Sequence, residues 1–372
     1  MYLLKDIEKK TVQFVPNYDD SEVEPVILPA KFPNLLVNGS EGISAGYATY
    51  IPPHNLNETI NLTIARIKNP KLTYDEAFKI LPGPDFPTGG IIQDSDDLKL
   101  ALETGRGKCT VRSKYEIIDH DIIISEIPYS VNKAQLVKRI DSIGTSKKID
   151  GIVEVRDESD KEGLRIVIET RKESNPDVII NYLLKNTDLQ LNINYNMIAI
   201  VDRSPKQLGV LEIIDAYIQH QKEVITNRSY FELDKAKKRL HILEGYHKLS
   251  SIVDDVVEIV KQSENKASAR QNIMDAFGFS ELQAEAIVTL QLYRLSKFDV
   301  KEFENEKIEI EKRIKELNLI LSNESALKKV IITELEEINA KIVTPRKSEI
   351  TKEEKALTEY VTLYMLRLLS NI

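Results

Sequence analysis

A glycine-rich segment from Pro33 to Thr49 carries the strongest chemical signal in the sequence. It reads PNLLVNGSEGISAGYAT, with three glycines among small and polar neighbours. Glycines let the backbone approach a ligand closely, and backbone N–H groups in such loops suit phosphates. The segment lacks the GxxxxGK[ST] pattern of a P-loop and the dinucleotide-binding fingerprint. It therefore suits a phosphate-bearing ligand without matching either nucleotide-binding motif.

One apolar side chain, Ile43, lies in the middle of this segment, and two roles are open for it. Proteins that bend DNA insert an exposed aliphatic wedge between base steps, beside donors to the backbone. Alternatively, Ile43 anchors the glycine-rich segment in the protein core. Taken alone, the residues favour the anchor.

A basic patch lies between Lys99 and Lys114, where five cations stand against Glu103 as the single acid. The cations are Lys99, Arg106, Lys108, Arg112 and Lys114. The alternation with Cys109, Val111 and Ser113 predicts a half-buried strand, with Lys108, Arg112 and Lys114 on its outer face and Gly105–Gly107 as an exposed turn. A row of cations on a strand suits a phosphate backbone, although a solvated sheet face is the commoner case.

Other polar clusters favour structural roles. We expect Asp94–Asp97 to cap a helix over Leu98–Leu102 rather than to bind magnesium, and His54 to belong to a turn and helix cap. The histidines lack metal-ligand spacing, and Cys109 is the only cysteine. No tyrosine has a recognisable neighbouring base. The sequence thus predicts neither a catalytic residue nor a metal site within this chain.

Composition limits the class of protein. The 372 residues are 42% hydrophobic and 30% charged, which supports a real core and excludes wholesale disorder. The net charge of −8 argues against nucleic acid binding, an objection that the local basic patch partly answers. We expect neither a signal peptide nor a membrane span, because no run of eighteen uncharged apolar residues exists. These features predict a soluble intracellular protein.

Proline divides the chain into two architectures, because none occurs from Lys206 to Thr344. That stretch is predicted to be helical, whereas the first half predicts an α+β domain with a mixed, largely antiparallel sheet. The expected strands are Cys109–Ser113 with Ile122–Ile127 as its hairpin partner, Gly151–Arg156, Gly163–Thr170 and Leu189–Val201. The expected helices are Met1–Lys10, Leu56–Ile67, Tyr74–Ile80, Asn132–Ile143 and Asp177–Lys185.

Apolar residues in the second half repeat with heptad spacing, interrupted at Ser322–Ser325. The repeats are Ile310, Ile314, Leu317 and Leu321, then Ile331, Leu335, Ile338 and Ile342. With a helix over Val210–Leu243 as partner, they predict an antiparallel arm with a small globular tip. An ordinary helical bundle fits the periodicity equally well. The apolar residues Ala356–Ile372 predict a terminal helix lying on another surface.

Several long blocks resemble the A subunit of bacterial type IIA topoisomerases. They include PNLLVNGSEGISAGYATYIPPHNL, GPDFPTGGII, ETGRGK, EIPYSVNK, KKIDGIVEVRDESD, LRIVIE and QAEAIVTLQLYRL, in order along the chain. The forms GISAGYAT, EIPY and QLYRL are more similar to topoisomerase IV of Gram-positive bacteria than to gyrase. A gyrase A fragment is the alternative within the family.

The resemblance implies a fold of a tower domain followed by a long antiparallel coiled-coil arm that ends in a small helical C-gate. The implied boundaries are a helix and linker at 1–25, the tower at 26–205, the outgoing helix at 206–244, the C-gate tip at 245–296, the returning helix at 297–344 and a non-family tail at 345–372.

The resemblance also implies residue roles. Ile43 falls on the position of the intercalating isoleucine, which reverses the preference for an anchor. The expected DNA-binding residues are Ile43, Lys31, Asn38, Ser40, Arg106, Lys108 and Arg112. The expected dimer interface at the C-gate is Gln283, Ala284, Ile287, Leu290 and Leu292. No metal ligand or catalytic residue is expected.

The implied activity is relaxation and decatenation of DNA by ATP-dependent passage of one duplex through another. The implied partners are double-stranded DNA, a second copy of the same chain through the C-gate, and the B subunit, with which the chain forms an A2B2 heterotetramer. Mg²⁺ and ATP would act through the B subunit. The implied location is cytoplasmic and nucleoid-associated, with peripheral membrane association in some family members.

The sequence departs from the family pattern at both ends. By spacing, the catalytic tyrosine of the family would precede Met1, so Tyr2 does not match it, and no β-pinwheel segment follows. We therefore expect this chain alone to bind DNA without cleaving it. A hypothesis of a different class is a coiled-coil adaptor in which the glycine-rich segment serves packing only.

Overall fold

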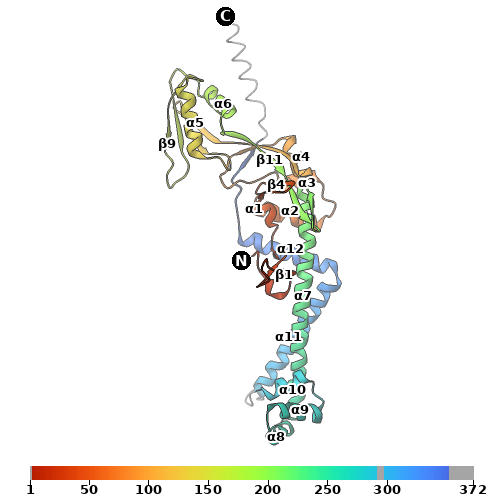
Figure 1. The fold of residues 1–372 in the computed structure, drawn as a ribbon. Helices are drawn as coiled ribbons and strands as arrows, with labels where there is room; N and C mark the ends of the chain where they lie inside the picture. The colour runs from red at the N-terminus through yellow and green to blue at the C-terminus, as the bar shows by residue number, and fades with distance from the viewer. Residues whose placement is uncertain (1, 291–296, 352–372) are drawn as a thin grey trace. The chain divides into compact units, whose positions relative to one another are not determined.

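The computed structural model describes residues 2–290 and 297–351 of the chain (Figure 1). The chain forms two compact units. The first contains Met1–Lys31 and His220–Thr333, and the second contains Phe32–Gln219 and the chain from Glu334. Among the described helices, none is both long and apolar enough to cross a membrane.

A six-stranded sheet forms the centre of the second unit. Its strands, in spatial order, are β14 (Glu349–Thr351), β5 (Ile91–Gln93), β6 (Arg106–Arg112), β11 (Gln190–Asn196), β4 (Tyr47–Ile51) and β3 (Ser40–Ser44). All neighbours are antiparallel except β14 and β5. Cys109, Val111 and Ser113 are fully buried, which confirms the predicted alternation. The mixed, largely antiparallel sheet is also confirmed.

The predicted hairpin partner of β6 is wrong. The segment Ile122–Ile127 contributes β8 (Asp121–Glu126), which pairs with β7 (Lys114–Ile118) in a second, four-stranded sheet. That sheet runs β7, β8, β10 (Ile166–Thr170) and β9 (Ile152–Asp157). Lys114 therefore belongs to this sheet and does not share a strand with Lys108. Arg106 and Gly107 also open β6 rather than forming a turn, and only Gly105 is a turn residue, with a φ of 75° after α4 (Asp96–Thr104).

Helices cover one face of each sheet, and most begin where the sequence indicates. The predicted helices appear as α2 (Leu56–Lys68), α3 (Tyr74–Ile80), α5 (Lys133–Thr145) and α6 (Pro176–Asn186), after the short α1 (Asn34–Asn38). Asn55 caps α2, and Thr73 forms a capping box with Glu76 at α3. Ser95 caps α4, which confirms the helix-capping interpretation of the acidic cluster.

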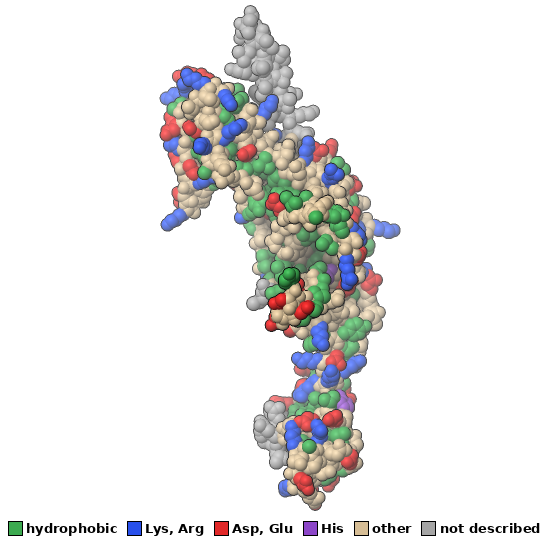
Figure 2. Space-filling model, in the orientation of Figure 1, with side chains coloured by type: hydrophobic (Ala, Val, Ile, Leu, Met, Phe, Trp, Pro, Cys, Tyr) green, Lys and Arg blue, Asp and Glu red, His purple; other side chains and the backbone are tan. Residues whose placement is uncertain are grey.

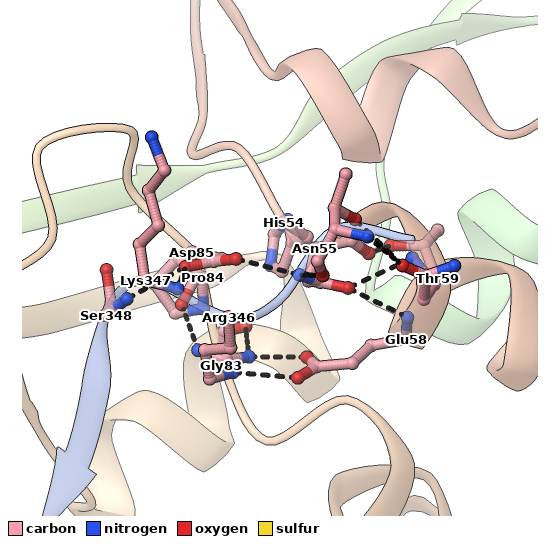
Figure 3. Close-up of polar contacts among 12 residues, drawn as sticks. His54, Asn55, Glu58, Thr59, Gly83, Pro84, Asp85, Arg346, Lys347 and Ser348 are labelled. Carbon is pink, nitrogen blue, oxygen red and sulfur yellow. Dashed lines mark hydrogen bonds and ion pairs between the residues drawn. The ribbon is translucent and has the colours of Figure 1, made fainter. Parts of the chain in front are cut away.

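After Pro345, the described residues contribute β14 to the six-stranded sheet. The Arg346 guanidinium donates to both carboxylate oxygens of Glu58 and to the carbonyls of Gly83 and Pro84 (Figure 3). The Asp85 carboxylate accepts from the backbone N–H groups of Lys347 and Ser348, each at 2.9 Å. These contacts seat β14 beside β5. The helix predicted over Ala356–Ile372 lies outside the described residues.

In the first unit, two helices run antiparallel. On α7 (Val210–Leu249) and α11 (Lys297–Ser322), Arg239 pairs with Glu306 at 2.6 Å, and Glu232 pairs with Arg313 at 2.7 Å. Lys222 pairs with Glu324, the first residue of α12 (Glu324–Lys341), at 2.7 Å. Along α7 the paired residues run from 222 to 239, while their partners run back from 324 to 306, as antiparallel packing requires.

Three short helices close the far end of this pair: α8 (Val253–Gln262), α9 (Lys266–Phe277) and α10 (Glu281–Val288). They share a small core with the end of α7. Its buried members are Leu249, Val256, Ile273, Phe279, Ala284 and Ile287. We call this compact cluster, formed by α8, α9, α10 and the end of α7, the helical tip.

The N-terminal segment forms the 3₁₀ turn η1 (Ile7–Lys9) and a hairpin of β1 (Phe14–Pro16) and β2 (Val23–Pro25), so the helix expected over Met1–Lys10 is wrong. Asp6 and Lys10 have left-handed φ values of 67° and 55° and interrupt any helix. The buried Asp6 carboxylate instead receives ion pairs from Lys9, Lys31 and Arg228 at 2.8 to 3.2 Å. Burial alone raises the pKa of Asp6, but these cations outweigh it and hold the pKa well below its usual range.

Candidate nucleic-acid interface

Two neighbouring strands build a continuous polar surface. In the antiparallel register, four outward residues of β6 lie opposite four outward residues of β11. The pairs are Arg106 with Asn196, Lys108 with Asn194, Thr110 with Asn192, and Arg112 with Gln190. We call these eight residues the polar ladder. Every cross-strand pair joins a cation or hydroxyl to an amide, and none contains a carboxylate.

The cations of the polar ladder differ in how they are partnered. Lys108 lies 3.1 Å from Asp97, and both side chains are half exposed, so water weakens that pair. Arg112 donates through Nε to the Gln190 side chain, which carries no charge. Arg106 is exposed, and among the described residues no carboxylate lies within ion-pair distance of it. Arg106 therefore keeps its positive charge available to a ligand.

Ile43 projects from the same face of the sheet as the polar ladder. Side chains of directly opposed strand residues point to the same face. Asn196 opposes both Arg106 and Tyr50, Tyr50 opposes Glu41, and Ile43 lies two residues beyond Glu41 in β3. The Ile43 side chain is 93% exposed. The core-anchor interpretation is therefore wrong, and a large apolar side chain stands in solvent on the same face as the cations, with two strands between them.

Backbone geometry fixes the β3–β4 hairpin that carries Ile43. Gly39 has a φ of 70°, and a side chain there would lie 2.4 Å from the Ile51 carbonyl oxygen. Thr49 donates through Oγ1 to the Ile198 carbonyl at 2.9 Å, and the Asn196 amide donates to the Ala48 carbonyl. The hairpin is thus attached to β11 and to the chain that follows it.

His54 packs beneath this surface rather than on it. Its ring lies edge-on to Tyr195, on the inner face of β11, with centroids 6.4 Å apart. Its Nδ1 lies 3.1 Å from the Leu36 carbonyl oxygen. Burial lowers the pKa of His54 to about 4, so the ring is neutral at pH 7. A buried, neutral histidine supports the turn-and-cap interpretation.

An open hollow of about 650 Å³ lies along the polar ladder. Arg106, Lys108, Asn194 and Asn196 form one side of its lining, and Ile198 and Gln207 contribute from the following hairpin. Asp97 also lines the hollow, where it pairs with Lys108. Because the hollow is open and the remaining polar lining consists of Arg106 and amides, it suits an extended anionic ligand rather than a small apolar one.

The remaining predicted DNA-binding residues have different surroundings. Lys31 belongs to the first unit, where it is 3% exposed and its ammonium lies 3.2 Å from Asp6. Lys31 is therefore not exposed on the surface that carries the polar ladder. Asn38 is exposed at the end of α1 and donates to Asn34, and Ser40 is half-buried in β3.

At the helical tip, the residues predicted to form a dimer interface differ in exposure. Ala284 is fully buried and Ile287 is 6% exposed, because both pack into the core of their own protomer. Gln283 is occupied by bonds to the Ser280 backbone and the His241 carbonyl. Leu290 is half-buried against the same core, and Leu292 lies outside the described residues. The exposed apolar residue on α10 is Leu282, at 54%.

Sequence reasoning missed the amide half of the polar ladder. The segment Gln190–Asn196 reads QLNINYN, in which amides alternate with Leu, Ile and Tyr. This two-residue period was visible as a strand. Its pairing with β6 was not, because some eighty residues separate the two strands.

Comparison with known proteins places the chain among relatives of one kind. The family model that describes the A subunit of DNA gyrase/topoisomerase IV matches residues 1–336. The A subunit of DNA topoisomerase 4 from Staphylococcus aureus is 53% identical over 379 residues, covering 98% of this chain and 47% of the relative. Proteins of that name from Streptococcus pyogenes and Streptococcus pneumoniae are each 51% identical over 361 residues, covering 96% of this chain and 44% of the relative. The chain thus spans less than half the length of these relatives.

Proposed function

Because the chain belongs to the A-subunit family of DNA gyrase and topoisomerase IV, we propose that it binds duplex DNA on the polar ladder and bends it with Ile43. The observation that carries this proposal is the shared face: an apolar side chain that is 93% exposed projects from the same face of the sheet as the polar ladder, whose cross-strand pairs contain no carboxylate. A highly exposed aliphatic side chain on a face that also carries cations suits insertion between base pairs.

The two parts of this surface have different tasks. Arg106, Lys108 and Arg112 position the phosphate backbone, and the ladder amides supply hydrogen bonds to phosphate and sugar oxygens. Ile43 enters between two base pairs and unstacks them. Unstacking costs on the order of a few kcal/mol, which the additional contacts of a bent duplex offset. Asn38, which is exposed at the end of α1, contacts the same backbone, whereas the Ser40 side chain lies on the opposite face of β3 from Ile43.

We propose that the chain acts as part of the A subunit of a topoisomerase IV. This subunit would act with a B subunit in an A2B2 assembly, which relaxes and decatenates DNA by ATP-dependent passage of a duplex. Mg²⁺ and ATP are assigned to the B subunit. In the described part of this chain, no three His, Cys, Asp or Glu side chains converge as a metal-ligand set. The chain's own contribution is to hold and bend the duplex.

In the same proposal, the second unit is the tower, α7 with α11 is the coiled-coil arm, and the helical tip is the C-gate. Two tips would meet through Leu282 and Leu290, with Ala284 and Ile287 supporting them from the protomer core. A Leu282→Arg variant should shift the chain from dimer to monomer in sedimentation equilibrium. A matched exposed leucine, Leu100→Arg, should not.

The DNA proposal is tested with the full chain and a 40-base-pair duplex carrying a fluorophore at each end. Wild-type protein should shorten the distance between the dyes, whereas Ile43→Ala should bind with an unchanged salt slope and bend less. Val153→Ala, at a residue that is 56% exposed in β9, is the matched control. Unchanged bending by Ile43→Ala would reject the wedge, and no DNA affinity would favour the coiled-coil adaptor.

A further inference from the structure

A second hairpin leaves the end of the polar ladder. It consists of β12 (Ile198–Val201) and β13 (Ser204–Gln207), which follow β11 after Met197. Asp202 and Arg203 form the turn with φ values of 54° and 61°, the left-handed pair of a tight two-residue hairpin. Thr49 of β4 bonds its base. The hairpin is therefore held beside the one that carries Ile43.

One face of this hairpin continues the wall of the hollow. Ile198 opposes Gln207 in the register, and both line the hollow with Arg106 and Lys108. Ile200 and Pro205 oppose each other two residues further out. Because side chains alternate along a strand, Ile200 and Pro205 share the face of the lining pair. Ile200 is 78% exposed, so this wall ends in a second large apolar side chain in solvent.

The turn of the hairpin adds a cation. Lys206 lies 3.0 Å from Asp202, so that pair is close to neutral. Arg203 is exposed, and no carboxylate of the described chain lies within ion-pair distance of it. The hairpin thus presents one unneutralised guanidinium beyond its apolar face.

We propose that the β12–β13 hairpin is a second duplex-contacting element, in which Ile200 packs against deoxyribose and Arg203 binds a phosphate. This inference rests on the proposed function, because the duplex that lies on the polar ladder must also fill the hollow. Continuity with the ladder and the positive sign of the free charge favour nucleic acid over an acidic or neutral partner at this hairpin. The hairpin is too narrow to offer a protein-sized apolar interface.

The test measures binding of the full chain to a 40-base-pair duplex over a range of salt concentrations. Arg203→Ala should lower the magnitude of the log–log salt slope by about 0.9, the value for one phosphate contact. Ile200→Ser should weaken binding about fivefold at every salt concentration and leave the slope unchanged, because an apolar contact releases no counterion. Ile200→Thr keeps a β-branched residue, which favours a strand, and so separates loss of the apolar contact from loss of the hairpin itself.

Matched controls come from the four-stranded sheet. Lys161→Ala removes an exposed cation from the loop between β9 and β10, and Val153→Ser removes an exposed apolar side chain. Arg106→Ala reports on the polar ladder. If both hairpin variants behave like their controls while Arg106→Ala weakens binding, the hairpin inference fails and the proposed function stands. If the wild-type chain has no measurable DNA affinity, both fail.

Discussion

Arginines on the two sheets of the second unit have opposite surroundings. In β9, Arg156 lies 2.9, 3.1 and 2.7 Å from carboxylates of Glu154, Glu158 and Glu169. In β6, Arg106 faces the amide of Asn196 and lies within ion-pair distance of no carboxylate in the described residues. Figure 2 shows acidic and basic side chains interspersed over the region of the four-stranded sheet, at the upper left.

The comparison teaches that a cation on an exposed strand says little about a ligand until its cross-strand partners are known. An amide partner donates and accepts hydrogen bonds but leaves the charge in place. A carboxylate partner neutralises it. Arg156 of the four-stranded sheet therefore links neighbouring strands, whereas Arg106 of the six-stranded sheet keeps a charge that no carboxylate of the described residues neutralises.

The two sheets should also respond differently to acid, and this is the largest effect we expect. His54 is buried under the six-stranded sheet with its pKa lowered to about 4, whereas the buried core of the four-stranded sheet consists of Ile and Leu. Below the usual histidine pKa of ~6.5, the unfolded chain binds a proton that the folded chain excludes until about pH 4. The free energy of unfolding should therefore fall by about 3 kcal/mol between these pH values.

Hydrogen exchange at pH 7 and pH 5, corrected for intrinsic rates, checks this prediction. Amides of β4, β6 and β11 should lose protection at pH 5, while those of β8 and β10 keep theirs. His54→Gln, which retains a side-chain donor for the Leu36 carbonyl, should remove the difference between the two pH values. Equal loss of protection in both sheets would mean that His54 does not set the acid response.

A pair of arginine substitutions tests the comparison directly on DNA. Arg106→Ala should weaken duplex binding about tenfold at ~0.1 M salt and lower the magnitude of the salt slope by about 0.9, because one phosphate contact is lost. Arg156→Ala should leave both values unchanged, since its charge is already neutralised. The measurement is fluorescence anisotropy of a labelled duplex. A similar loss in the two variants would contradict the assignment of the binding face.

Local signals in the sequence were sufficient for much of this surface. The alternation around Cys109 and Val111 placed the outer residues of β6 correctly, and the caps at Asn55 and Thr73 marked the starts of α2 and α3. Such signals depend on neighbours within a few residues. The resemblance, rather than the residues, favoured exposure of Ile43, because a lone isoleucine between glycines is compatible with either role.

The sequence predictions that were wrong depended on contacts between residues distant in sequence. The strand after β6 was taken as its hairpin partner because sequential strands usually pair, but the chain changes sheets at Ser113 and β11 takes that place. Asp6 lies in an unwound turn because Arg228, far along the chain, pairs with its carboxylate.

The smallest effect is expected from a variant in which Arg156 of the four-stranded sheet is given surroundings like those of Arg106 in the six-stranded sheet. In a Glu154→Gln, Glu169→Gln variant, Arg156 keeps hydrogen-bonding neighbours and loses two of its three neutralising charges, so it comes to resemble Arg106. If unneutralised charge on a strand is sufficient for phosphate binding, duplex affinity should rise about twofold, with a salt slope up to ~0.9 steeper. If the slope does not change, the position of Arg106 on the same face as Ile43 matters as well as its free charge, and binding is confined to the six-stranded sheet. Glu116→Gln, on an exposed residue of β7, controls for the loss of one negative charge at a position away from Arg156.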